Sequence, residues 1–206
     1  LLGRITIDDI LNFVKEEAEK DLQIASGISD DIEANDTIWD ITRARLPWLI
    51  IGLLGGLLGA KVIGAFELKN NFELAFFIPL IAAMAGNVGI QSAAIVVQSL
   101  ANKSLKNNQT FNRLFKEFRV AIFNGLICSI LILFLTYIIG YSIELSITVS
   151  ISLLCVIVFA ALFGTFTPLF LERYKIDPAL ATGPFITTVN DILGLIIYFL
   201  IGQALL

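Results

Sequence analysis

The chain has 206 residues, of which 57% are hydrophobic and 16% are charged. Soluble globular domains have about 45–50% apolar and about 25% charged residues, so this composition excludes an ordinary soluble enzyme. A net charge of −4 and the lack of histidine argue against nucleic-acid binding and exclude catalysis by a Ser-His-Asp or Cys-His arrangement. The composition predicts an all-α membrane protein.

The charge is unevenly distributed along the chain. Residues 1–40 hold 11 acids and 3 bases, whereas residues 41–206 hold 7 acids and 11 bases. We therefore expect an acidic, water-soluble N-terminal segment joined to a mildly basic body that lies in lipid. The chain begins on Leu1 without a secretory signal pattern, and we interpret it as a fragment of a longer protein.

Five segments of the body are long and apolar enough to cross the hydrocarbon core, which takes about 20 helical residues. They are residues 46–66, 74–101, 120–141, 147–171 and 178–206. Lysine and arginine concentrate before the first of these spans and in the loops after the second and fourth. Because cytoplasmic loops are enriched in these residues, we expect a cytoplasmic N-terminus and an external C-terminus in the plasma (inner) membrane.

The first two predicted spans carry small and polar residues at helical spacing. In the first, Gly52 and Gly56, and likewise Gly55 and Gly59, are four residues apart, a spacing that lets helix backbones approach closely. In the second, one side of the helix holds three amides, Asn87, Gln91 and Gln98. Two interpretations of these amides stay open: hydrogen bonds between helices, or the lining of a water-filled path.

The fifth predicted span holds one ionisable residue, Asp191, near its middle. A carboxylate in hydrocarbon is costly and usually marks an ion or proton pathway. Pro184 removes a backbone hydrogen bond, and we expect it to disturb the helix so that the Thr187 carbonyl faces the same space as Asp191. Residues at three- or four-residue spacing form a predicted lining stripe: Gly183, Thr187, Asn190, Asp191 and Gly194.

This stripe offers oxygen ligands, which hard cations such as Mg²⁺, Mn²⁺ and Ca²⁺ prefer. One carboxylate per chain is few for a divalent ion, so we expect a two-fold dimer that brings two copies of Asp191 together. A proton- or sodium-coupled exchanger with Asp191 as the titrating group is the alternative. A scaffold or sensor with a protonated, packed Asp191 is a third interpretation, and a membrane enzyme is a distant fourth.

Three strings in order along residues 41–206 resemble the MgtE family of magnesium channels and transporters: RLPWLIIGLLGGLLGA, FFIPLIAAMAGNVGIQSA and DPALATGPFITTVNDILGLIIYF. The string GRITIDDILNFVKEEAEKDL resembles the end of the second CBS domain that precedes the membrane part in that family. The resemblance implies a CBS remnant over residues 1–28, a connecting (plug) helix over 29–45 and a five-helix channel domain over 46–206.

The resemblance further implies a homodimer whose central pore is formed by the second and fifth spans. Asp191 would select Mg²⁺ there, Asp177 would lie at the cytoplasmic entrance, and Asn87 would face the pore. Cytoplasmic Mg²⁺-sensing domains of the same full-length chain would gate it. The candidate metal residues are thus Asp191, Thr187, Asn87 and Asp177, and the candidate pore-lining residues are Gly183, Pro184, Asn190, Gly194 and Gln91.

The acids near the predicted pore mouth have two interpretations. They are either an ordinary solvated surface or a site that attracts cations and holds regulatory Mg²⁺. The residues concerned are Asp30, Asp31, Glu33, Asp36 and Asp40.

Overall fold

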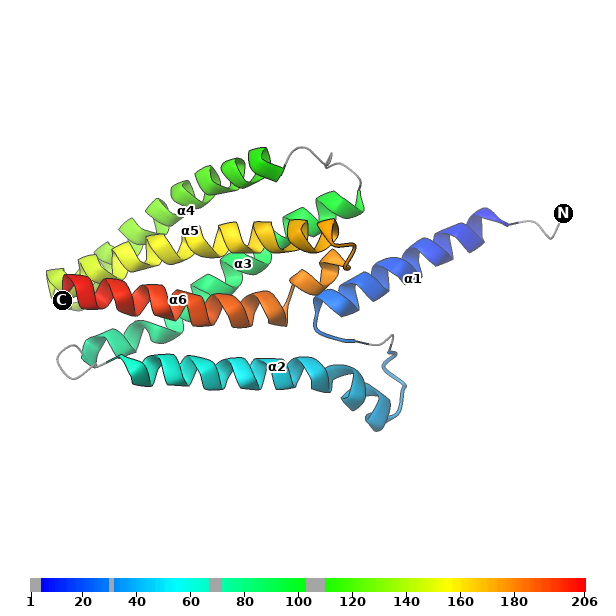
Figure 1. Cartoon of the computed structure of the whole chain (residues 1–206), viewed down its shortest axis with the longest axis horizontal. Coiled ribbons are helices and arrows are strands. Elements are labelled where there is room, and N and C mark those ends of the chain that lie inside the picture. The colour runs from blue at the N-terminus through cyan, green and yellow to red at the C-terminus, as the bar shows by residue number, and fades with distance from the viewer. Residues whose placement is uncertain (1–4, 30–31, 67–71, 103–109) are drawn as a thin grey trace.

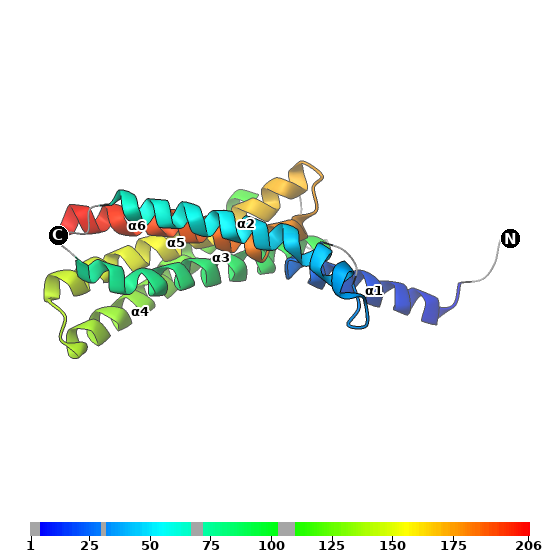
Figure 2. The ribbon, with the colours of Figure 1, turned by 90° about the horizontal axis from the view of Figure 1, so that it is seen from below.

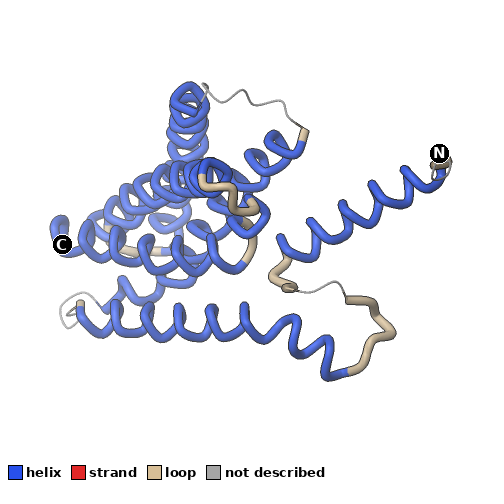
Figure 3. The backbone as a smooth tube through the Cα atoms, turned by 45° about the vertical axis from the view of Figure 1, so that its right-hand side comes forward, coloured by secondary structure: helices blue, strands red, loops and turns tan. Residues whose placement is uncertain are grey.

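The computed structural model describes residues 5–29, 32–66, 72–102 and 110–206. The elements in chain order are α1 (Ile7–Ala25), α2 (Ile38–Ala65), η1 (Phe72–Phe77), α3 (Ile78–Ala101), α4 (Thr110–Ile139), α5 (Ile143–Arg173), η2 (Pro178–Ala181) and α6 (Pro184–Leu205). Every described element is helical, which confirms the predicted all-α class (Figure 3). Within the described ranges, five segments are long and apolar enough to cross a membrane, and they correspond to α2, η1 with α3, α4, α5 and α6.

The helices extend beyond the predicted spans where hydropathy alone gives no signal. α2 begins at Ile38 rather than at residue 46, because the Thr37 side chain caps its first turn by accepting a hydrogen bond from the Asp40 N–H. α4 begins at Thr110 rather than at residue 120. Both extensions mix charged and apolar residues, which weakens the hydropathy signal at the start of each helix.

α5 is the centre of the bundle. It packs against α4, α3 and α6, while α2 packs along α6. Figure 1 shows α2 and α4 at opposite edges of the bundle, and Figure 2 shows α4 again at an edge. The hydrophobic core is built from α3, α5 and α6, and its largest fully buried side chains are Tyr198 and Phe199 of α6 and Ile81 of α3. The Tyr198 hydroxyl donates to the Leu74 carbonyl (2.8 Å), so η1 is held against the end of α6.

α1 projects away from the bundle and touches it through its C-terminal end (Figure 1). At this junction a Cβ on Gly183 would lie 2.2 Å from the Ala25 carbonyl oxygen, and Gly183 has φ +65°. Both observations favour glycine, since there is no room for a side chain and L-residues rarely adopt this φ. The backbone of α1 therefore lies directly against the residue that precedes α6.

The segment over residues 29–45 is not one separate helix. Its described residues before Ile38 form turns and loop, and the rest are the first turns of α2. The helix that stands free of the bundle is α1, which falls in the range assigned to the CBS remnant. The domain roles of these segments stay predictions.

Candidate ion pathway between α3 and α6

The start of α6 differs from the sequence prediction. The predicted fifth span is interrupted, because η2 ends at Ala181 and Pro184 is the first residue of α6. Proline at this position disturbs nothing, since its missing N–H would have no partner in the helix. The Thr187 N–H donates to the Gly183 carbonyl (3.1 Å), and the Thr187 hydroxyl does so at 3.0 Å. α6 runs unbroken from Pro184 to Leu205, so the expected break in the helix after Pro184 is wrong.

Asp191 lies closer to one end of its helix than the sequence suggested. It is in the third turn of the 22-residue α6, about 10 Å from the first residue along the axis. Its side chain is half-buried, and its Oδ1 atom is inaccessible and has no hydrogen-bond partner among the described residues. An ionised or polar atom in this setting calls for a partner that the single described chain does not supply.

Asp191 faces the backbone of α3 at Gly86. A Cβ built on Gly86 would lie 3.3 Å from Asp191 Oδ1 and 3.1 Å from Thr187 Cγ2. Glycine here lets α6 approach α3 closely enough to place both side chains on the α3 backbone. The structure thus brings two of the candidate metal residues, Asp191 and Thr187, to one contact between α3 and α6.

The predicted lining stripe divides into two faces. Asn190 is fully buried, and its amide lies against Gly89, where a Cβ would be 1.8 Å from Asn190 Nδ2. Gly194 is also buried, with Ala85 and Val156 as neighbours. Asn190 and Gly194 therefore point into the bundle, whereas Asp191 is only half-buried. A pore-lining role for Asn190 and Gly194 stays a prediction.

The amides of α3 lie on the outside of the single chain. Asn87 and Gln91 are exposed, as is Gln98, while the residues on the other side of the helix are buried. Polar side chains on a membrane-spanning helix need polar partners. This face is therefore suited to water or to a second chain rather than to lipid tails.

Asp177 lies at the η2 end of the pathway. It is exposed and caps η2, where its side chain accepts a hydrogen bond from the Ala179 N–H (2.9 Å). Asp21 of α1 is its neighbour: partial burial raises the pKa of the Asp21 carboxyl, and the negative charges of Asp177 and Glu17 add to this effect. Sequence reasoning did not place Asp21 here, because nothing in the local pattern of α1 indicates contact with η2.

The acids of the predicted regulatory site take local structural roles where they are described. The Glu33 N–H donates to Asp36, and Asp40 lies in the capped first turn of α2. Asp30 and Asp31 lie outside the described residues. In the part of the chain that the structure describes, no group of three or more acidic or cysteine side chains is arranged to hold a metal ion.

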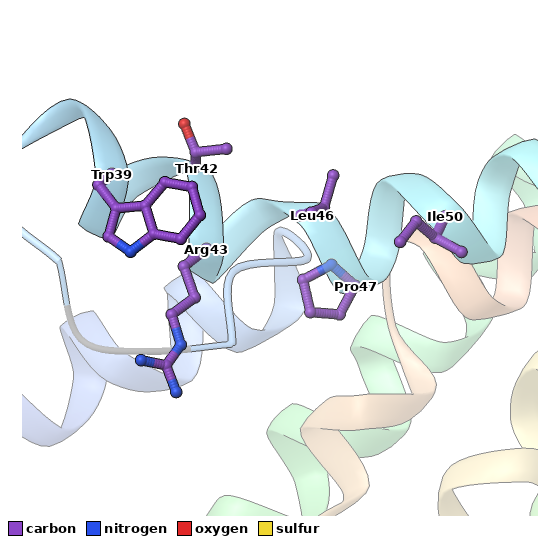
Figure 4. Close-up of a pocket in the computed structure, with 6 residues that line it drawn as sticks. All are labelled: Trp39, Thr42, Arg43, Leu46, Pro47 and Ile50. Atoms are coloured by element: carbon purple, nitrogen blue, oxygen red, sulfur yellow. The ribbon is translucent and has the colours of Figure 1, made fainter.

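Two surface hollows of the described bundle lie away from this pathway. One is formed by α2 alone and is lined by Trp39, Thr42, Arg43, Leu46, Pro47 and Ile50 (Figure 4). Another lies on the outer face of α4. A buried hydrogen bond that sequence reasoning also missed, from the Ser92 hydroxyl of α3 to Glu117 Oε1 of α4 (2.7 Å), ties these two helices together.

Known divalent cation transporters are similar in sequence to this chain. The MgtE family model, described as a divalent cation transporter, matches residues 78–201. The magnesium transporter MgtE of Bacillus subtilis is 39% identical over 206 residues, which cover 99% of this chain and 46% of that protein. The magnesium transporters MgtE of Enterococcus faecalis and Thermus thermophilus are 33% and 32% identical over 98% and 100% of this chain, and over 45% and 46% of their own lengths. The chain spans about half the length of these curated relatives.

Proposed function

Because the chain belongs to the MgtE family of divalent cation transporters, we propose that it forms the membrane pore of a Mg²⁺ channel. Two copies of the chain pair so that α3 and α6 of each line a central pathway. The two Asp191 carboxylates bind the ion there. Mn²⁺ and Ca²⁺, which prefer the same oxygen ligands, are the further candidate substrates.

The observation that carries this proposal is the environment of Asp191. Its half-buried carboxylate lies on the glycine backbone of α3, and no described cation pairs with it. Beside it, α3 presents exposed Asn87 and Gln91 on the same helix as Gly86. The Asp191 carboxylate thus has no partner cation among the described residues and lies against the helix that presents an exposed face of amides. A hydrated cation pathway needs such an arrangement, whereas a lipid-facing surface avoids it.

The electrostatics of a pair of carboxylates suit Mg²⁺. Two facing Asp191 side chains carry a charge of −2 and balance one divalent ion. Mg²⁺ gives up its water reluctantly, so we expect contact partly through water, with the exposed Asn87 and Gln91 amides orienting the hydration shell. A membrane potential that is negative inside favours entry by about 2.3 kcal/mol per charge per 100 mV, and passive flow therefore needs no coupled ion.

We further propose that cytoplasmic Mg²⁺-sensing domains of the full-length protein gate this pathway. The relatives are about twice as long as this chain. We expect the N-terminal side to be cytoplasmic, with Asp177 at that entrance and regulatory domains joined to the bundle through α1. Mg²⁺ bound between those domains would close the pathway.

Replacing Asp191 tests the site directly. In liposomes that contain a Mg²⁺-sensitive dye, we expect D191A and D191N to lower Mg²⁺ influx to the level of protein-free vesicles. D191N keeps the size of the side chain and removes its charge, so it separates electrostatics from packing. E144Q, which neutralises an exposed acid in the first turn of α5, should keep the wild-type influx. Normal influx through folded D191N would refute the assignment.

The coupled exchanger is distinguished by its driving force. A channel current reverses at the Mg²⁺ equilibrium potential whatever the gradients of H⁺ and Na⁺. A reversal potential that moves when either of these gradients is changed would favour the exchanger and would make Asp191 its coupling group.

A further inference from the structure

A surface hollow of about 880 Å³ lies on the outer face of α4. Its lining changes character along the helix. Lys116 and Arg119 lie toward the N-terminal end with Asn112 and Phe115. The next turns are mainly apolar, with Asn124 as their one polar residue: Ile122, Phe123, Asn124 and Leu126. The hollow therefore has a cationic end and an apolar end, joined by aromatic side chains.

This change in character coincides with the expected edge of the hydrocarbon. α4 has 30 residues and is about 45 Å long, against about 30 Å for the hydrocarbon core. The predicted span begins at residue 120, directly after Arg119. The cations of the hollow would thus lie at headgroup depth and its apolar residues beside the upper parts of the lipid tails.

Among the described residues, no acid forms an ion pair with the two cations of the hollow. The acid on the same turns of α4, Glu117, is turned inward and is bonded to Ser92. Within the described residues the one ion pair is Lys15 with Glu19 on α1. Lys116 and Arg119 are both exposed, so their charge is available to a ligand.

The described residues of the chain leave this face open. α4 packs mainly on α5 and forms one edge of the bundle in Figures 1 and 2. Phe115 is 56% exposed and Phe123 is 67% exposed. The Asp191 contact lies between α3 and α6, so this face is separate from the proposed pore.

We propose that the α4 hollow binds an anionic phospholipid, with the lipid phosphate between Lys116 and Arg119 and an acyl chain along Ile122, Phe123 and Leu126. Lys and Arg attract anionic headgroups at the membrane surface, and aromatic rings are favoured at the same depth. This inference does not depend on which ion the protein transports.

The hollow of α2 in Figure 4 supplies a matched control, because it combines the same kinds of residue with less positive charge. Arg43 is its one cation, and Asp40 lies one turn before it. Pro47 has no N–H to donate to the Arg43 carbonyl, which leaves an acceptor oxygen near the headgroup level. These features disfavour an anion at α2 relative to α4.

The test is the binding of phosphatidylglycerol and phosphatidylcholine to the purified full-length chain in mild detergent, with bound lipids counted by native mass spectrometry. We expect K116Q/R119Q to weaken phosphatidylglycerol binding by about fivefold for each cation removed and to leave phosphatidylcholine binding unchanged. R43Q should bind nearly as much phosphatidylglycerol as the wild type. K116R/R119K keeps both positive charges and should bind it as the wild type does.

Three results would overturn the proposal. The first is equal phosphatidylglycerol binding by wild type and folded K116Q/R119Q. The second is an equal loss in R43Q, which would show a general effect of net charge. The third is a shift of K116Q/R119Q from dimer to monomer with unchanged lipid binding, which would assign this face to a second copy of the chain.

Discussion

α5 and α2 are both long apolar helices with glycines, yet they occupy opposite environments. Of the most apolar 18-residue stretch, 61% is buried in α5 and 11% in α2. A Cβ on Gly164 of α5 would lie 2.3 Å from the Gly89 carbonyl oxygen, whereas Gly52 and Gly56 of α2 have no neighbour within 4 Å of such an atom. Apolar composition therefore identifies both spans, and only the packing distinguishes a central helix from a peripheral one.

Within α2, one pair of glycines at i and i+4 packs against another helix and the other pair does not. Gly55 meets Thr188 of α6, and Gly59 meets Leu195, while Gly52 and Gly56 face away from the described bundle. Small residues at i and i+4 allow close helix contact, but a contact forms only on the face that another helix meets.

The strongest test of this contrast is Gly164→Ala in α5. The added methyl group would collide with the backbone of Gly89, and a backbone cannot move aside as a side chain can. We expect a destabilisation of about 1–3 kcal/mol or more, measured as a lower midpoint of thermal unfolding in detergent by fluorescence-detected size exclusion. An unchanged midpoint would show that α3 and α5 are less closely packed than described.

A smaller effect is expected at α2, where two neighbouring glycines make a matched pair. A Cβ on Gly55 would lie 1.9 Å from Thr188 Cγ2, and that side chain can rotate away, so Gly55→Ala should destabilise the fold less than Gly164→Ala. Gly56→Ala meets no atom and should be neutral, or stabilising by up to about 1 kcal/mol through helix propensity. If the two variants behaved alike in the same unfolding assay, the division of α2 into a packed and an open face would fail.

The smallest effect concerns the junction of α1 with η2 and depends on pH. The pKa of Asp21 is raised in the folded chain above its ordinary value of 3.8. As the pH falls from neutral toward 3.8, the folded chain binds a proton at Asp21 more readily than the unfolded chain does. The junction should therefore become more stable over this pH range. Asp21→Asn should remove this dependence and protect α1 slightly better at neutral pH. Hydrogen exchange of α1 amides at several pH values measures both.

Asp9, at the far end of α1, provides the control of opposite sign. Hydrogen bonds from the Thr6 side chain and backbone lower the pKa of the Asp9 carboxyl. Its contribution is therefore present at neutral pH and is lost as the pH falls through the lowered pKa. Parallel responses of Asp21→Asn and Asp9→Asn would contradict the described surroundings of both acids.

Hydrophobic runs predicted the five spans because polar residues are costly in hydrocarbon. Nearly every residue of a membrane-spanning helix is therefore apolar and contributes to the signal. They did not predict where α2 and α4 begin, since capping and polar first turns lie outside the apolar signal. The orientation and the dimer stay predictions.

The candidate site was predicted less completely than the spans. Asp191 was singled out because one carboxylate in an apolar run is conspicuous. Its neighbour Asn190 was grouped with it, yet consecutive helix residues differ by about 100° in direction, and α3 and α5 decide which of them is buried. Pro184 was interpreted as a break because sequence does not show that a turn at Gly183 comes first.

The contact between Gly183 and Ala25 has a mechanical consequence. No side chain lies between the two backbones at that point, so nothing soft is available to absorb a displacement. The end of α1 thus lies directly against the residue that precedes α6, the helix that carries Asp191 in its third turn. A side chain at position 183 would have to separate the two backbones, so this junction depends on glycine.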